Sequence, residues 1–143
     1  MRIALKYGLL ISVCIIAWVV IAHLLFPNPL SPVHSLGAAV FFNVCELTGI
    51  YLGIKARERE KPDGLTFKEG VNTGLSIAFV YALAACLFFL IVMGFLGSKM
   101  MAAEPGTERV VMAKAFLGLF LSAIVLGVIY STVISFILAK RKS

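Results

Sequence analysis

Charged residues are scarce in this sequence. Lys, Arg, Asp and Glu make up 14% of its 143 residues, whereas soluble domains carry about 25%. Hydrophobic residues make up 61%, and most of them fall in four long apolar runs that one soluble core of this size could not hide. The scarcity of charge therefore excludes an ordinary soluble domain. The sequence also contains no catalytic, metal or cofactor motif that we recognise.

Cysteine and histidine are too few and too dispersed to build a site. Cys14, Cys45 and Cys86 all lie inside apolar runs, which argues against a disulfide framework and a surface thiol oxidant. We interpret them as small apolar packing residues. His23 and His34 flank a proline-rich segment without a carboxylate or thiol beside them, which makes a poor metal site. We expect neither a metal nor a cofactor.

Four apolar runs in the sequence are long enough to cross a bilayer, whose hydrocarbon core is spanned by roughly 20 helical residues. The runs cover about 7–26, 33–54, 71–96 and 115–138. They do not alternate in polarity as a membrane strand of about 10 residues would, and a helix pairs its backbone groups within itself. We predict an all-α polytopic membrane protein, with residues 1–143 forming a single four-transmembrane-helix bundle. The first run is too long for a signal peptide, so we expect it to remain as the first helix.

The net charge of +6 comes from basic residues placed beside the apolar runs. Ten of the thirteen lie on one side of the predicted bundle: Arg2, Lys6, Lys55, Arg57, Arg59, Lys61, Lys68, Lys140, Arg141 and Lys142. The positive-inside rule assigns that side to the cytoplasm. We therefore predict a bacterial inner-membrane protein with cytoplasmic N- and C-termini, a cytoplasmic loop at 55–70, and outer loops at 27–32 and 97–114. The basic residues would also attract anionic lipid headgroups, and we expect no nucleic-acid partner.

Prolines predict the shape of the connections between the runs. Three of them lie between positions 27 and 32, where they end the first helix and turn the chain into an antiparallel hairpin. Residues 55–61 are predicted to extend the second helix, and a turn at 62–64 follows it.

Capping signals predict where the third and fourth helices begin. Thr66 and Glu69 match a capping box, in which each residue hydrogen-bonds the backbone of the other, so the third helix should start at Phe67. A turn and a fresh cap at 104–107 predict that the fourth helix starts at Glu108. A helix that long would need to tilt or project from the membrane.

Two of the predicted helices carry stripes of small residues. The stripe on the fourth consists of Ala123, Gly127, Ser131 and Ser135. The stripe on the second consists of Ala39, Asn43, Glu46, Gly49 and Gly53. Small side chains at such spacings let two helix backbones approach closely, so we predict that both stripes are packing faces. The partner face is left open between another helix and a second subunit. Because so small a bundle should not need both stripes internally, we expect self-association or a dedicated membrane partner.

Glu46 is the only carboxylate within an apolar run. It lies about 12 Å from the cytoplasmic end of the second run, close to mid-membrane, and should face the bundle interior because exposure to lipid is costly. Asn43 is its polar neighbour, and Tyr81, Tyr130 and Ser131 are hydrogen-bond candidates at similar depth. We expect Glu46 to be protonated unless water or a cation reaches it. Two interpretations stay open: a proton or cation site, and a protonated structural hydrogen-bonder.

The centre of the sequence resembles a known family. Residues 51–58 (YLGIKARE) and 64–70 (GLTFKEG), followed by Gly74, are similar to a family of uncharacterised bacterial membrane proteins, domain of unknown function 4199. Its members have four spans, a basic motif that ends the second span and a short charged loop before the third. The resemblance implies the four-span layout, and it implies no activity, cofactor or site residue.

The sequence predicts a function mainly through what it leaves out. With almost no extramembrane mass and one acid within the spans, we expect a non-enzymatic accessory or scaffold component that packs with itself or with a membrane partner. The alternative is a small proton- or cation-coupled transporter, or an oligomeric channel, that uses Glu46. A transporter needs only such a sparse site.

Overall fold

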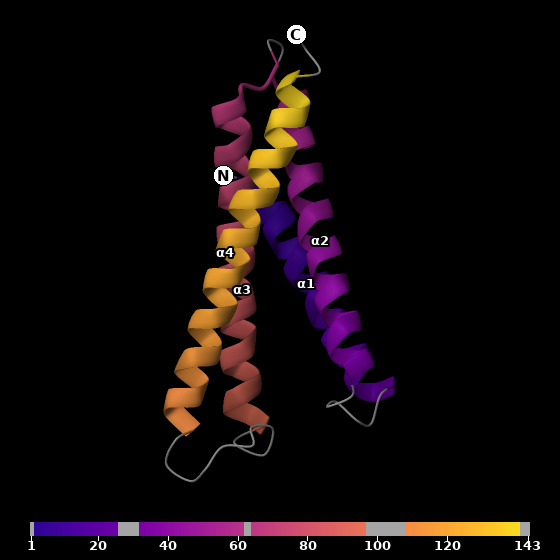
Figure 1. The fold of residues 1–143 in the computed structure, drawn as a ribbon, viewed down its shortest axis with the longest axis vertical. Coiled ribbons are helices and arrows are strands. Elements are labelled where there is room, and N and C mark those ends of the chain that lie inside the picture. The colour runs from indigo at the N-terminus through magenta and orange to yellow at the C-terminus, as the bar shows by residue number, and fades with distance from the viewer. Residues whose placement is uncertain (1, 26–31, 62–63, 97–107, 141–143) are drawn as a thin grey trace.

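The computed structural model (Figure 1) describes residues 2–25, 32–61, 64–96 and 108–140. These residues form four helices: α1 (Arg2–Leu25), α2 (Pro32–Arg59), α3 (Phe67–Leu96) and α4 (Glu108–Lys140). Each helix is long and apolar enough to cross a membrane, with candidate spans of 21 to 25 residues. The described part of the chain contains no strand. The predicted all-α fold is confirmed, and its architecture is that of a multi-pass membrane protein.

The second connection is shorter than the apolar runs predicted. α2 continues to Arg59 and α3 begins at Phe67, so much of the predicted loop at 55–70 is helical. The extension of α2 and the start of α3 both follow the local signals in the sequence. The predicted outer loop at 27–32 lies outside the described residues except for Pro32, which is the first residue of α2.

α4 is the longest helix and begins at Glu108, as predicted. Its 33 residues correspond to about 50 Å, whereas a bilayer core is roughly 30 Å thick. α4 must therefore tilt or project from the membrane. Of the predicted outer loop at 97–114, residues 97–107 lie outside the described part, and 108–114 are helical.

The capping box predicted before α3 is confirmed. The Glu69 amide donates to Thr66 Oγ1 at 3.3 Å, and the Thr66 amide donates to Glu69 Oε2 at 3.1 Å. Lys61, in the connection from α2, forms an ion pair with the same glutamate. Gly64 supplies a positive φ of 82°, which a residue with a side chain rarely adopts. These contacts fix the approach of the chain to α3.

The helices form two pairs that diverge along the bundle. α3 packs against all three other helices, and its contact with α4 is the most extensive. We call the end where α2 stops and α3 starts the basic end, because Lys55, Arg57, Arg59 and Lys61 lie there. The opposite end, where α1 stops and α4 starts, is the far end. Towards the far end the α1–α2 pair separates from the α3–α4 pair (Figure 1).

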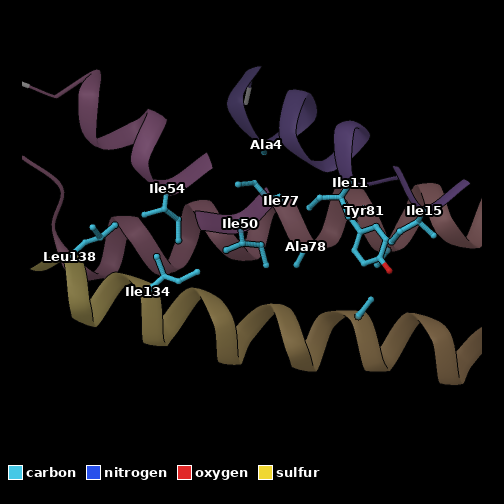
Figure 2. Close-up of a cluster of buried hydrophobic side chains, with 12 residues drawn as sticks. Ala4, Ile11, Ile15, Ile50, Ile54, Ile77, Ala78, Tyr81, Ile134 and Leu138 are labelled. Atoms are coloured by element: carbon cyan, nitrogen blue, oxygen red, sulfur yellow. The ribbon is translucent and has the colours of Figure 1, made fainter. Parts of the chain in front are cut away.

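The half of the bundle near the basic end is tightly packed. Figure 2 shows Ile50 of α2, Ile77 of α3 and Ile11 of α1 meeting in one cluster, and all three are fully buried. Glycines on α2 allow this approach, since a Cβ on Gly49 would overlap the Ile11 side chain and one on Gly53 would overlap Ile77. The glycines of the predicted α2 stripe therefore pack inside the chain.

The small residues of α4 pack against a matching stripe on α3. A Cβ on Gly70 of α3 would overlap Ser135 of α4, and one on Gly74 would overlap Ser131. A Cβ on Gly127 of α4 would overlap Ala78 of α3. The α3 stripe continues to Ala82, which is buried, at the same four-residue spacing. That spacing is present in the sequence at Gly70, Gly74, Ala78 and Ala82, and we did not predict a packing face from it. It is the same packing signal that predicted the α4 face.

The α4 stripe and the part of the α2 stripe from Glu46 to Gly53 therefore pack within one chain, whereas Ala39 of the α2 stripe is exposed. We expected self-association because we assumed that packing within one chain would not use both stripes. That assumption is wrong, since residues of both stripes form close contacts within the chain. The cause is the four-residue stripe on α3, which provides the second surface. Any contact with another subunit would have to use the outward faces of the helices, which expose large hydrophobic side chains such as Leu36, Leu117 and Phe136.

Candidate functional site

The carboxyl group of Glu46 is buried in the middle of the bundle. Its residue is 3% exposed and lies on the face of α2 that continues through Gly49 and Gly53. Glu46 Oε1 lies 3.5 Å from the position that a Cβ on Gly127 would occupy, so the side chain points at the α3–α4 contact. This orientation avoids the cost of exposing a carboxyl group to lipid.

A cavity of about 510 Å³ extends from Glu46 into the far half of the bundle. All four helices line it, with Ser12, Ile15, Ile16, Val19, Ala39, Phe42, Asn43, Glu46, Tyr81, Ala85, Phe88, Phe89, Leu119, Ser122, Ala123 and Leu126. The lining residues nearest the basic end are Ser12, Glu46, Tyr81 and Leu126, one from each helix. Beyond them lies the packed isoleucine cluster. Glu46 therefore lies at the inner end of a cavity in the part of the molecule where the helix pairs diverge.

Glu46 is the one acidic side chain among the described residues that line the cavity. None of these residues is Lys, Arg or His. Within the described part of the chain, Glu46 Oε1 is buried and has no hydrogen-bond partner. A buried polar atom without a partner is costly. The carboxyl group thus has neither a counter-ion nor a full set of hydrogen bonds from the residues around it.

The other predicted site residues divide into two groups. Tyr81 and Asn43 line the cavity together with Glu46. Tyr130 joins them indirectly, since its hydroxyl donates to Asn43 Oδ1 at 2.6 Å. Ser131 does not join them: it packs against Gly74, and its hydroxyl donates to the Val128 carbonyl oxygen at 3.1 Å.

The Asn43, Ser12 and Ser122 side chains donate hydrogen bonds to backbone carbonyl oxygens of their own helices. The Asn43 amide group donates to the Ala39 carbonyl oxygen at 2.7 Å, and the Ser12 hydroxyl donates to that of Gly8 at 2.9 Å. The Ser122 hydroxyl bonds in the same way to Leu119, at 3.0 Å. The hydroxyl oxygens of Ser12 and Ser122 and the amide oxygen of Asn43 can each still accept a hydrogen bond from a ligand.

Several cavity residues were not predicted from the sequence. Ser12 and Ser122 stand out only as isolated hydroxyls in apolar runs. Phe42, Phe88 and Phe89 could not be recognised from the sequence, because phenylalanine is found as readily on a lipid-facing surface as in a cavity wall. Whether they line the cavity depends on the rotation of each helix about its axis. A helix that is hydrophobic on all sides has no polar face from which that rotation could be predicted.

The only tryptophan of the chain lies beside the cavity. Trp18 neighbours the lining residue Val19, and its ring stacks on Phe41 with the ring centroids 4.4 Å apart. Its indole nitrogen is buried and has no hydrogen-bond partner among the described residues. Trp18 is therefore a built-in reporter of changes in this half of the bundle.

Metal binding finds no support in the described residues. Among them, no three His, Cys, Asp or Glu side chains gather closely enough to hold an ion. The side chains of His23 and His34 lie outside the described part. The cysteines are free thiols.

A second hollow, of about 1090 Å³, lies towards the basic end. Its charged lining residues are of both signs: Arg2, Arg57, Glu60 and Glu69. Arg57 is paired with Glu60 at 3.1 Å, and Glu69 with Lys61. Because acids compensate these cations, the hollow has no clear preference for an anion.

Fold and site together define a class of protein, a multi-pass helical membrane protein with a cavity that ends at a buried carboxyl group. Comparison with family models, curated proteins and solved structures finds no match to this chain.

Proposed function

We propose that this protein is a small proton- or cation-coupled membrane transporter that uses Glu46 as its ion-binding group. The observation that carries the proposal is the buried carboxyl group at the inner end of the cavity, with no counter-ion among the described residues. A carboxyl group in such a place exchanges a proton for a cation more readily than one already held in an ion pair. Intramembrane acids that face a cavity commonly mark ion pathways.

The packing on the two sides of Glu46 supports a transport site over a purely structural carboxyl group. The cavity extends from Glu46 towards the far end, whereas the buried side chains of Ile11, Ile50 and Ile77 pack between Glu46 and the basic end. A site reached from one side and closed on the other is one of the two states that alternating access requires. The reverse state would need the glycine contacts of α2 and α4 to loosen.

The proposal includes an orientation and a location. The excess of basic residues on one side favours cytoplasmic N- and C-termini in a bacterial inner membrane, so the cavity would face outward. The likeness of residues 51–70 to the four-span family fits this layout and adds no activity. The protein is proposed to be non-enzymatic, because the described residues that line the cavity include no second carboxylate and no Lys, Arg or His.

Glu46→Gln in proteoliposomes tests this proposal. Gln preserves shape and neutral hydrogen bonding but cannot exchange a proton. Proton flux would be measured with an internal pH dye under imposed pH, membrane-potential and cation gradients. We expect flux in the natural protein and loss of at least ten-fold in the variant. Glu60→Gln is the control, because it removes the same charge from a side chain that is 55% exposed at the basic end.

An accessory or scaffold role is the second candidate. The hydrogen bond between Tyr130 and Asn43 beside the cavity and the close helix contacts favour it, because both are consistent with a purely structural Glu46. This role would involve a membrane partner, a second copy or anionic lipids at the basic end. It expects Glu46→Gln to retain normal levels, partner capture and cellular phenotype, and it expects no Glu46-dependent flux under any gradient.

A further inference from the structure

We infer that the cavity binds a monovalent organic cation, an ammonium group carrying apolar substituents, with its charge at Glu46. This inference rests on the proposed function and specifies the ligand of the same site. It follows from three properties of the cavity: its single charge, its aromatic and aliphatic walls, and its size.

The charge of the ligand follows from the groups around Glu46. Among the described residues that line the cavity there is one carboxyl group and no Lys, Arg or His, so one positive charge balances the site. An inorganic cation is a poor fit, because hard cations take about six or more oxygen ligands. Besides the two carboxyl oxygens, the described lining side chains offer one oxygen each on Ser12, Asn43, Tyr81 and Ser122. These do not gather at one point, since Ser122 lies about one helical turn, roughly 6 Å, from Leu126 towards the far end. An ammonium group needs fewer partners, since the carboxylate provides the opposite charge.

The apolar character of the ligand follows from the walls. Four aromatic rings line the cavity, those of Phe42, Tyr81, Phe88 and Phe89. Aromatic faces attract ammonium groups, and desolvation strengthens the attraction. Most of the other lining residues are aliphatic, so a bare proton or a strongly hydrated ion would leave these walls without a partner.

The size and direction of the cavity specify how the ligand lies. A volume of about 510 Å³ falls in the range of roughly 300–1,000 Å³ typical of sites for small organic molecules. Glu46 is at the inner end, next to the sealed isoleucine cluster, and Val19, Phe89 and Leu119 lie towards the far end. The ligand therefore inserts with its ammonium group first and leaves its apolar part towards the far end.

A pair of matched probes tests the inference on the natural chain. Benzyltrimethylammonium carries the required charge, and neopentylbenzene has the same shape without it. Binding to the purified full-length protein would be measured by calorimetry and by Trp18 fluorescence, in detergent and in lipid nanodiscs. We expect saturable binding of the cation and at least ten-fold weaker binding of the neutral probe. Equal affinity for both, as for a cavity that takes a lipid chain, would overturn the inference, and so would failure of the cation to bind.

Variants identify the site of binding. Glu46→Gln should weaken cation binding at least ten-fold, whereas Glu60→Gln should leave it unchanged. Ala85→Phe should block the cavity without touching the carboxyl group, and its control, Leu87→Phe, adds the same ring at an exposed position. Cation binding that survives both Glu46→Gln and Ala85→Phe would contradict the assigned site.

The outcomes separate this inference from the proposed function. Glu46-dependent flux of protons or inorganic cations, without binding of the organic probe, would overturn the ligand class and leave the transporter intact. Glu46-dependent binding of the probe without flux in any gradient would support the ligand class and contradict transport.

Discussion

Gly127 lies against both Ala78 of α3 and the buried carboxyl group of Glu46. Its missing side chain allows α4 to contact Ala78 of α3, and it also leaves room for Glu46 Oε1. One glycine thus serves the helix contact and the inner end of the cavity. A larger residue here would act on both at once.

We therefore predict that Gly127→Leu destabilises the folded bundle by roughly 1–3 kcal/mol, the usual cost of overpacking a tight contact. The sequence left open whether the stripe that contains Gly127 and Ser131 packs against another helix or against a second subunit. In the structure both positions face α3. The measurement is thermal or denaturant unfolding in a mild detergent, followed by Trp18 fluorescence.

Gly118→Leu is the matched control, because nothing lies within 4 Å of a Cβ at that position of α4. It should leave the unfolding transition almost unchanged. Equal stability of the two variants would mean that the α3–α4 contact is looser than described.

At the scale of the elements, the α2–α4 contact contains a hydrogen bond that crosses between the two helix pairs. Tyr130 of α4 donates to Asn43 of α2, next to the cavity. α2 contacts α4 less extensively than it contacts α1 or α3, so this bond is a notable part of the link between α2 and α4. It ties the diverging pairs together at mid-depth.

We predict that Tyr130→Phe destabilises the protein by about 0.6 kcal/mol and by no more than about 1.7 kcal/mol, the range measured for hydrogen bonds between membrane helices. A double-mutant cycle with Asn43→Leu isolates the pair, because the second change should cost less once the bond is gone. The same unfolding measurement applies. Strictly additive costs would show that the hydroxyl and the amide do not interact in the membrane.

At the scale of the whole molecule, the two ends of the bundle differ in both charge and packing. The basic end carries the connection between α2 and α3 and a hollow lined by charges of both signs, while the cavity that starts at Glu46 extends towards the far end. If the basic end is cytoplasmic, the cavity faces the outside of the cell. The orientation therefore decides the side from which a ligand arrives.

Single cysteines test the orientation in a background without native thiols. Val110→Cys lies near the start of α4 at the far end, where the native side chain is exposed, and Lys61→Cys lies between α2 and α3. An impermeant thiol reagent added to intact cells should label the first and miss the second. The opposite pattern would invert the bundle and turn the cavity towards the cytoplasm.

Much of the fold could be predicted from local features of the sequence. Apolar length predicts the four helices, the capping box predicts the start of α3 at Phe67, and the stripe through Gly127 predicts a packing face on α4. The candidate site could be predicted only around Glu46. The contacts of the neighbouring polar residues could not be predicted, because equal depth in the membrane placed Ser131 and Tyr130 in one group. In the structure, the rotation of α4 directs Ser131 towards α3 and Tyr130 towards Asn43.

The sequence by itself determined that the chain has four membrane-length helices and one mid-membrane carboxyl group, because hydropathy and helix caps act over a few neighbouring residues. Only the tertiary structure decided which surfaces meet. The four-residue stripes of α3 and α4 pair with each other, and Gly49 and Gly53 admit isoleucines from α1 and α3. The cavity exists because these contacts close one half of the bundle while the helix pairs diverge in the other (Figure 1). Such an arrangement depends on residues far apart in the chain, so no local pattern specifies it.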